Sequence, residues 1–315
     1  MQTLNKLGCE GDLLALTIGS AVPQEHGPEV LSRARERAAL IPDLLIEARR
    51  IANTVTNGWH GRRRRGQGDT FWQFRPYDQG ESLSRIDWRR SARDDSVYIR
   101  DQEWEAAHTV WIWADSSASM LYKSEHTQVS KQSRALVLAF AMAEILAKSG
   151  ERVGWPGVTN ALSNRAAAER IAAELAAAKI DTSLSFPPLE QIRRRSELVI
   201  ISDFLDPVET TLERMHHSAQ QGIHGSLVHI IDPAEERFPY AGRTEFHDPE
   251  NGNRLTFGRA ETVADAYASI FQARRETLSD HCKRLGWNYL DHHTDRLAST
   301  ALVLLHGQLS GEAMT

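Results

Sequence analysis

Two apolar runs of this chain end in an aspartate, and the first continues into a short serine pattern. The first run reads Trp-Ile-Trp-Ala and is followed by Asp115, Ser117 and Ser119. The second run, over residues 197–202, ends at Asp203. Carboxylate and hydroxyl oxygens are hard ligands, so this set predicts a site for Mg²⁺ or Mn²⁺. Two parallel strands that finish in an aspartate can hold such an ion from one side, beyond the edge of the sheet.

The Asp-x-Ser-x-Ser run also has a simpler interpretation. Asp and Ser are common N-caps of helices, so the run could serve only to start the next helix. On that interpretation the same residues form a structural turn that binds no ion. The position of Asp203 at the end of a second strand favours the metal site.

Apolar strands alternate with helical patterns from residue 109 onward. Strands are predicted near residues 109–115, 153–158, 197–203, 226–232 and 287–291, and helices near residues 128–148, 166–179, 208–221 and 260–285. This alternation predicts a mainly parallel sheet covered by helices. An inserted hairpin is predicted over residues 244–257, with its turn at residues 248–253.

The first hundred residues have a different character. Weak periodicity at the start predicts a loosely held arm. From Pro42, apolar residues recur at intervals of three and four and predict a helix that ends near Gly58. Aromatic pieces punctuated by glycine then predict short strands and turns. The resulting division is an arm over residues 1–40, a helix with a β-rich segment over 41–107, and an α/β domain over 108–310.

Composition limits the classes of function. The 315 residues include 37 basic and 42 acidic side chains, a net charge of -5 that gives no general attraction to nucleic acid. The longest apolar stretch, Ala135–Ala143, is shorter than the roughly 20 residues of a membrane span. Cys9 and Cys282 are far apart, so neither a disulfide framework nor a thiolate zinc site is predicted. We expect a cytoplasmic protein without a secretory signal.

Two further clusters have simple explanations. Arg62–Arg65 form a basic run that could bind nucleic acid or an acidic partner, but we favour a solvated loop because no nucleic-acid motif accompanies the run. The pairs His216–His217 and His292–His293 suggest zinc. Adjacent histidines on a regular element point in different directions, and no third ligand is suitably spaced, so no zinc site is predicted.

Two blocks upstream of the first strand carry a recognisable pattern. Residues 74–81 read Phe-Arg-Pro-Tyr-Asp-Gln-Gly-Glu, and residues 85–93 read Arg-Ile-Asp-Trp-Arg-Arg-Ser-Ala-Arg. Followed by the Asp-x-Ser-x-Ser run, they resemble the bacterial domain of unknown function 58 family over about residues 58–305. The resemblance implies a Rossmann-like von Willebrand factor A domain over 108–310, with helices on both faces of the sheet, preceded by the β-rich segment and the N-terminal helix.

The aspartates and serines themselves resemble the metal-ion-dependent adhesion site of von Willebrand factor A domains. In that site serines and a threonine bind the cation directly, and the aspartates often act through water. For this sequence the resemblance implies a ligand set of Asp115, Ser117, Ser119, Thr182 and Asp203. Thr182 is the choice in the loop over residues 179–185, and Ser183 is the alternative.

The resemblance implies a function as well. It implies a non-enzymatic, metal-dependent docking adaptor that works with a MoxR-type AAA+ ATPase and a client protein, in protein remodelling or cofactor insertion. An acidic side chain of the partner would fill the open coordination position of the ion. The chain has no Walker sequence, so it is not itself the ATPase.

The alternative is a metal-dependent hydrolase that uses Asp115, Ser117 and Ser119. A haloacid-dehalogenase phosphatase would need a second aspartate where Ser117 stands. A serine hydrolase would need a Gly-x-Ser-x-Gly elbow, which is missing from the sequence. We therefore favour the adaptor.

Overall fold

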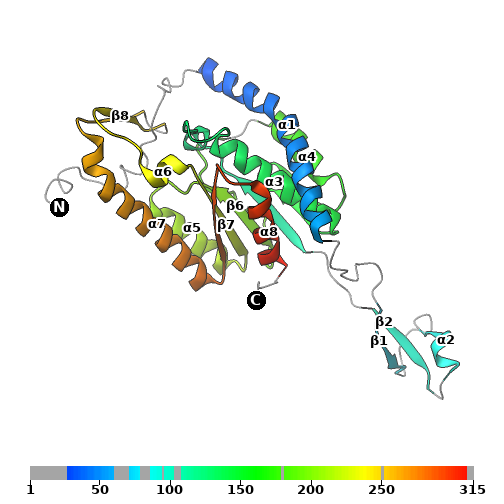
Figure 1. Cartoon of the computed structure of the whole chain (residues 1–315). Coiled ribbons are helices and arrows are strands. Elements are labelled where there is room, and N and C mark those ends of the chain that lie inside the picture. Colours follow the sequence, from blue (N-terminus) through cyan, green and yellow to red (C-terminus); the bar gives the residue numbers. More distant parts are fainter. Residues whose placement is uncertain are drawn as a thin grey trace. The chain divides into compact units, whose positions relative to one another are not determined.

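The computed structural model describes the chain over residues 27–59, 71–78, 86–93, 96–102, 108–178, 181–249 and 252–310. Most of the predicted arm lies outside these residues, as do Cys9 and Arg62–Arg65. The chain divides into two compact units. The larger is formed by residues up to 58 and from 108 onward, and the smaller by residues 59–107. The sheet and its helices belong to the larger unit (Figure 1).

Six strands form the sheet of the larger unit. In spatial order they are β10 (Asn288–His293), β7 (His224–Ile231), β6 (Glu197–Ser202), β3 (Thr109–Ala114), β4 (Arg152–Trp155) and β5 (Thr159–Leu162). All neighbours pair in parallel except β5, which runs antiparallel to β4 at one edge. The prediction of a mainly parallel α/β sheet is confirmed. Strand β5 was missed because its sequence, Thr-Asn-Ala-Leu, contains no apolar run.

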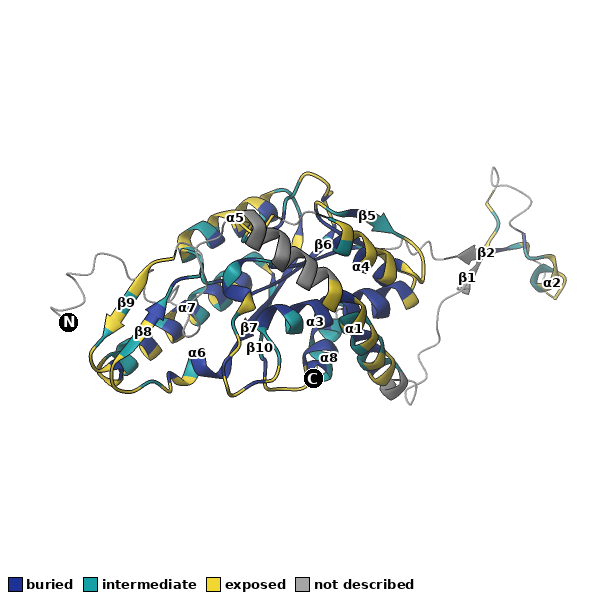
Figure 2. Ribbon diagram, turned by 90° about the horizontal axis from the view of Figure 1, so that it is seen from above, coloured by how far each residue is buried: buried dark blue, intermediate teal, exposed yellow. Residues whose placement is uncertain are grey.

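Helices cover both faces of this sheet. One face carries α3 (Lys131–Lys148) and α8 (Ala298–Leu309), and the other carries α5 (Val208–Gln220) and α7 (Ala264–Leu285) (Figures 1 and 2). The sheet, α8 and α4 (Ala167–Ala177) all contact α3. This explains why α3 is buried continuously from Ala135 to Ala147, a stretch in which Glu144 is the one charged residue. None of the helices in the described stretches combines the length and apolar sequence that a membrane crossing requires.

Helix α1 (Gly27–Trp59) lies almost wholly in the larger unit, and residues of its C-terminal half pack on the rest of that unit. Ala48, Ala52 and Val55 are buried at helical spacing on one face. The helix begins well before the predicted start, and Pro42 lies inside it. The sequence before Pro42 is rich in Glu, Leu, Arg and Ala, whose helix propensity extends the helix into the predicted arm.

An accessory layer follows β7. Helix α6 (Pro233–Arg237) leads into the hairpin of β8 (Thr244–His247) and β9 (Arg254–Phe257), which confirms the predicted hairpin. The aromatic rings of Phe238 and Phe246 pack with Tyr267 and Phe271 of α7 in a separate buried cluster. Because Phe238 ends α6, this cluster fixes the position of α6 beside the sheet.

The smaller unit contains a second hairpin and one turn of helix. Strand β1 (Phe71–Pro76) pairs antiparallel with β2 (Tyr98–Gln102), and α2 (Trp88–Ser91) lies between them in the sequence. The Asp87 carboxylate caps α2 by accepting a hydrogen bond of 2.9 Å from the backbone N–H of Arg90. The Arg90 guanidinium lies 5.1 Å from the ring centroid of Tyr98. These charged residues therefore stabilise local structure.

Gly225 lies where β7 meets Trp287, and no side chain fits there. A Cβ atom at Gly225 would lie 2.1 Å from the Trp287 ring. We expect Gly225→Ala to lower the free energy of unfolding by about 1–3 kcal/mol, because overpacking forces neighbouring groups to move. Urea unfolding measures this, with Gly258→Ala as the control, since a Cβ at Gly258 meets no atom within 4 Å. Equal stability of the two variants would contradict the prediction.

Candidate metal centre

Four of the five predicted metal residues lie at the switch point of the sheet. Strands β3 and β6 are neighbours, and the sheet continues from β3 to β4 on one side and from β6 to β7 on the other. Asp115 directly follows β3, and Asp203 directly follows β6. The backbone N–H of Asp115 donates to the carbonyl of Ile201 at 2.9 Å, which holds the two strand ends together. Open α/β sheets bind ligands at such a point.

Both carboxylate oxygens of Asp115 accept hydrogen bonds. The backbone N–H of Ser117 donates to Oδ1 at 2.8 Å, and the hydroxyl of Ser202 donates to Oδ2 at 2.7 Å. The Ser202 oxygen in turn accepts a hydrogen bond of 3.0 Å from the backbone N–H of Phe204. The Asp115 carboxylate is thus held in one orientation. Ser202 was missed at the sequence level, where its only signal is its place just before Asp203.

Two serines complete the cluster. The hydroxyls of Ser117 and Ser119 are hydrogen-bonded at 3.1 Å, and Ser119 also bonds the carboxylate of Asp203. Four of the five predicted residues, Asp115, Ser117, Ser119 and Asp203, therefore lie together, and each is only 3–6% exposed. We call these four residues the oxygen cup.

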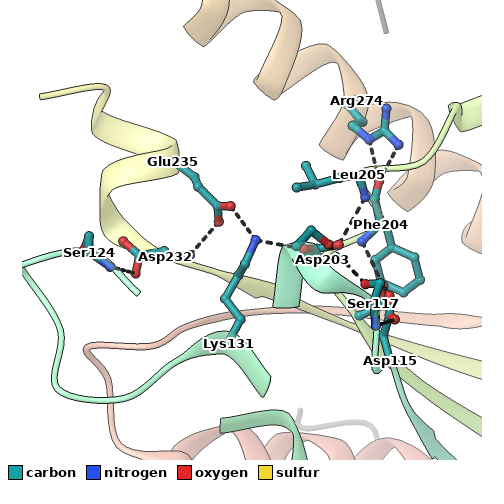
Figure 3. A network of polar contacts seen from close by, with 12 residues as sticks. Asp115, Ser117, Ser124, Lys131, Asp203, Phe204, Leu205, Asp232, Glu235 and Arg274 are labelled. Carbon is teal, nitrogen blue, oxygen red and sulfur yellow. Dashed lines mark hydrogen bonds and ion pairs between the residues drawn. The ribbon is translucent and has the colours of Figure 1, made fainter. Parts of the chain in front are cut away.

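A buried lysine already pairs with the oxygen cup. Lys131, at the start of α3, has no exposed surface. Its ammonium donates to Asp203 Oδ2 at 2.8 Å and to Glu235 Oε1 at 2.5 Å, and Figure 3 shows it between the two carboxylates. Neither Lys131 nor Glu235 was predicted. One signal was available, because a lysine in the first turn of a helix opposes the helix dipole and needs another reason to be there.

Helix α6 holds Glu235 in place through a capping box. The carboxylate of Asp232 accepts from the backbone N–H of Ala234 at 2.9 Å, and Glu235 Oε2 accepts from the backbone N–H of Asp232 at 2.9 Å. Asp232 Oδ2 also accepts from the backbone N–H of Ser124 at 3.0 Å. The capping box therefore connects α6 to the loop that precedes α3.

The backbone after Asp203 is turned and clamped. Phe204 has φ 48°, in the left-handed region that a phenylalanine rarely adopts. The guanidinium of Arg274, from α7, donates through Nε to the Phe204 carbonyl at 2.7 Å and also bonds it through Nη2. The backbone N–H of Leu205 then donates to Asp203 Oδ1 at 3.3 Å. Figure 3 shows Arg274 bonded to the Phe204 carbonyl on one side of Asp203, and Glu235 bonded to Lys131 on the other.

The two aspartates of the oxygen cup have different pKa values. Burial, and next the charge of Asp203, raise the pKa of Asp115 to about 7, against the hydrogen bonds from Ser202 and Ser117. Burial also acts to raise the pKa of Asp203. There, however, the charge and hydrogen bond of Lys131 prevail and hold the pKa of Asp203 below its usual value. Asp203 is therefore the ionised member of the pair at neutral pH.

The pKa values of Lys131 and Glu235 also differ from those of exposed lysines and glutamates. Burial acts to lower the pKa of Lys131, but the charges of Asp203 and Glu235 raise it above its usual value. Burial raises the pKa of Glu235, and the charge of Lys131 only partly opposes this. The ammonium of Lys131 is therefore a permanent positive charge beside the oxygen cup.

Thr182, the fifth predicted ligand, lies on an exposed loop. Asp181, Thr182 and Ser183 are all exposed. The Asp181 carboxylate accepts hydrogen bonds from the backbone N–H and the hydroxyl of Ser183, at 2.9 and 2.6 Å. No hydrogen bond between described residues joins Thr182 to the oxygen cup. Its role as a ligand, and that of Ser183, stays a prediction.

The oxygen cup fits a small divalent cation in its chemistry. Its donors are two carboxylates and two hydroxyls, the hard oxygens that Mg²⁺ and Mn²⁺ prefer. The Lys131 ammonium, 2.8 Å from Asp203 Oδ2, shows that this edge of the sheet accommodates a positive charge beside Asp203. Within the described stretches, no group of three or more His, Cys, Asp and Glu side chains is arranged to hold a metal. The oxygen cup is not such a group, because two of its four residues are serines.

Three of the four adjacent histidines hydrogen-bond to other side chains. His216 and His217 are exposed and hydrogen-bond to Gln220 and Gln221, one helical turn further along α5. His293 hydrogen-bonds to Glu236 at 2.9 Å. The contacts of His216 and His217 are local, that of His293 joins β10 to α6, and the two pairs come from different elements.

Comparison with known proteins gives a family and several relatives. The family model described as "Protein of unknown function DUF58" matches residues 73–277. The uncharacterized proteins Rv1480 of Mycobacterium tuberculosis and Mb1516 of Mycobacterium bovis are each 24% identical over 279 residues, which is 82% of this chain and 85% of theirs.

Two solved structures are also similar. One is the conserved hypothetical protein BatB from Bacteroides thetaiotaomicron, with a TM-score of 0.36, and the other is an aerotolerance-related membrane protein from Bacteroides fragilis, with a TM-score of 0.34. Each is 18% identical and covers 65% of this chain and 100% of its own.

Proposed function

Since this chain belongs to the DUF58 family, whose function is unknown, we propose that it is a docking protein that binds Mg²⁺ or Mn²⁺ in the oxygen cup and catalyses no reaction itself. The observation that carries the proposal is the convergence of Asp115, Ser117, Ser119 and Asp203 at the switch point. An ion held from one side keeps coordination positions for other ligands. A carboxylate of another protein would take one of them.

We also propose that the larger unit is a von Willebrand factor A domain. The order of its strands supports this. Across the sheet, from β5 to β10, they are the third, second, first, fourth, fifth and sixth in the chain, the order of a doubly wound sheet. The oxygen cup lies between the first and the fourth, where the resemblance to a metal-ion-dependent adhesion site requires it.

The partner that we propose presents an acidic side chain. Following the family resemblance, the first candidates are a MoxR-type AAA+ ATPase and its client protein, in protein remodelling or cofactor insertion in the bacterial cytoplasm. The hydroxyls of Ser117 and Ser119 bring oxygen without charge, which leaves the cation able to attract a carboxylate.

Cation binding should stabilise the folded protein. At a cation concentration 100 times Kd, the free energy of unfolding of the wild type should rise by about 2.7 kcal/mol. The double variant Ser117→Ala/Ser119→Ala should lose most of this gain, because it removes two ligands and no charge. Thermal unfolding with Mg²⁺, Mn²⁺ or a chelator measures the gain. Ser269→Ala, an exposed serine of α7, is the control.

Docking itself needs a second measurement. A MoxR-type ATPase should bind the immobilised wild-type protein with Mn²⁺ present, and a chelator or the double serine variant should abolish the binding. Binding that is indifferent to the cation would exclude the cup as the docking site. Turnover of ester or phosphate substrates that disappears in Ser117→Ala would favour the hydrolase.

A further inference from the structure

We propose that Lys131 and Glu235 set the affinity of the oxygen cup for its cation, Lys131 by weakening binding and Glu235 by offsetting that effect. The inference rests on the proposed function, because it concerns the same cation. It assigns a role to two residues outside the ligand set. The weaker affinity would make the docked state reversible.

Solvent does not reach Lys131, so the electrostatic effect of its charge on the cup is little weakened by screening. Its side chain has no exposed surface, and its ammonium contacts Asp203 Oδ2 at 2.8 Å. The ring of Tyr122 covers another side, with its centroid 5.7 Å from Nζ. Charges in such surroundings are screened far less than charges in water. A cation that enters the cup would therefore bind an Asp203 carboxylate whose charge Lys131 already partly neutralises.

The charges balance differently with and without a divalent cation. Without it, the Lys131 ammonium pairs with the carboxylates of Asp203 and Glu235, and the Asp115 carboxylate is hydrogen-bonded to Ser117 and Ser202. A divalent cation in the cup would offset the charges of Asp115 and Asp203. Lys131 would then depend on Glu235 as its counter-ion, through the contact that already measures 2.5 Å. By neutralising the charge of Lys131, Glu235 thus reduces the electrostatic repulsion between Lys131 and a cation in the cup.

Glu235 is suited to this role because its position does not depend on the cup. Its second oxygen accepts from the backbone N–H of Asp232 at 2.9 Å within the capping box of α6. The aromatic cluster that includes Phe238 fixes the end of α6. The carboxylate therefore stays beside Lys131 whatever fills the cup.

Replacing these two residues should change cation affinity in opposite directions. Lys131→Met removes a like charge and should tighten Mn²⁺ binding about tenfold, whereas Glu235→Gln leaves Lys131 without its own counter-ion and should weaken binding by a similar factor. The double variant Lys131→Met/Glu235→Gln has the same net charge as the wild type. Its affinity should return to within about threefold of the wild-type value.

Isothermal titration of the full chain with Mn²⁺ alone tests the proposal. Lys123→Met, an exposed lysine in the loop before α3, is the control and should keep the wild-type affinity. If Lys131→Met is too unstable to measure, Glu235→Gln and the double variant still give the comparison.

The outcomes separate the two proposals. Opposite shifts in the single variants that cancel in the double variant support the role of Lys131 and Glu235. Wild-type affinity in both single variants would overturn it and leave the metal site standing, even if the variants are less stable. No Mn²⁺ binding by any of the proteins would overturn the proposed function and, with it, this inference.

Discussion

Lys131→Met is expected to lower the free energy of unfolding by about 3–5 kcal/mol in the presence of a chelator, because it breaks a buried ion pair by removing one partner. Asp203 and Glu235, whose side chains are only 4% and 12% exposed, would keep their carboxylates with no ammonium between them. Methionine has nearly the same length and an apolar stem, so it leaves little empty space. Urea unfolding of both proteins measures the difference.

An exposed lysine in the same kind of ion pair provides the control. Lys283 contacts Asp280 at 2.9 Å, almost the distance between Lys131 and Asp203, but 73% of its side chain is exposed. Because solvent screens this pair, Lys283→Met should leave stability nearly unchanged. Similar losses in the two variants would show that burial of Lys131 has no energetic importance. A smaller loss in Lys131→Met when Mn²⁺ is added would agree with the cation taking over the charge of Asp203.

Asp115→Asn should stabilise the cation-free protein above neutral pH and have little effect in acid. The pKa of Asp115 is raised to about 7 in the folded protein, from an ordinary value of 3.8. The folded state therefore holds a proton that the unfolded state releases between these values, and the wild type loses stability as pH rises from about 4 to 7. Asparagine stays neutral at every pH and keeps an acceptor for the N–H of Ser117.

The difference in stability between Asp115→Asn and the wild type should grow by about 1.4 kcal/mol per pH unit over that range and reach a few kcal/mol at pH 8. Urea unfolding in chelator at several pH values between 4 and 8 measures it. Asp265→Asn, an exposed aspartate at the start of α7, is the control and should show no such trend. A difference that does not change with pH would mean that Asp115 ionises near its ordinary pKa.

The parts of the site that follow directly from strands could be predicted from the sequence. Apolar runs identify strands β3 and β6, and each run ends in an aspartate. In a parallel sheet the carboxyl ends of strands lie at one edge, so Asp115 and Asp203 had to lie on the same side. The two serines follow within the same short loop. The sequence therefore led to four residues that the structure brings together.

The residues that surround this set could not be predicted in the same way. Lys131 belongs to the start of a helix and Glu235 to a short helix after β7, so only the packing of α3 and α6 brings them to Asp203. No local pattern encodes that contact. Helix α8 was also missed, because its apolar residues surround the helix and give no one-sided period. Thr182 depended on the family resemblance alone.

The order of strands has a consequence for how the protein is made. Strand β3 lies at the centre of the sheet between β4 and β6, but β6 is encoded far downstream of it. While the ribosome is still synthesising the intervening residues, β3 can pair with β4 only, and its other edge stays open. Unpaired strand edges in unfinished chains attract chaperones and favour aggregation. Slow translation between residues 163 and 196 should therefore lower the yield of folded protein more than slow translation after β6.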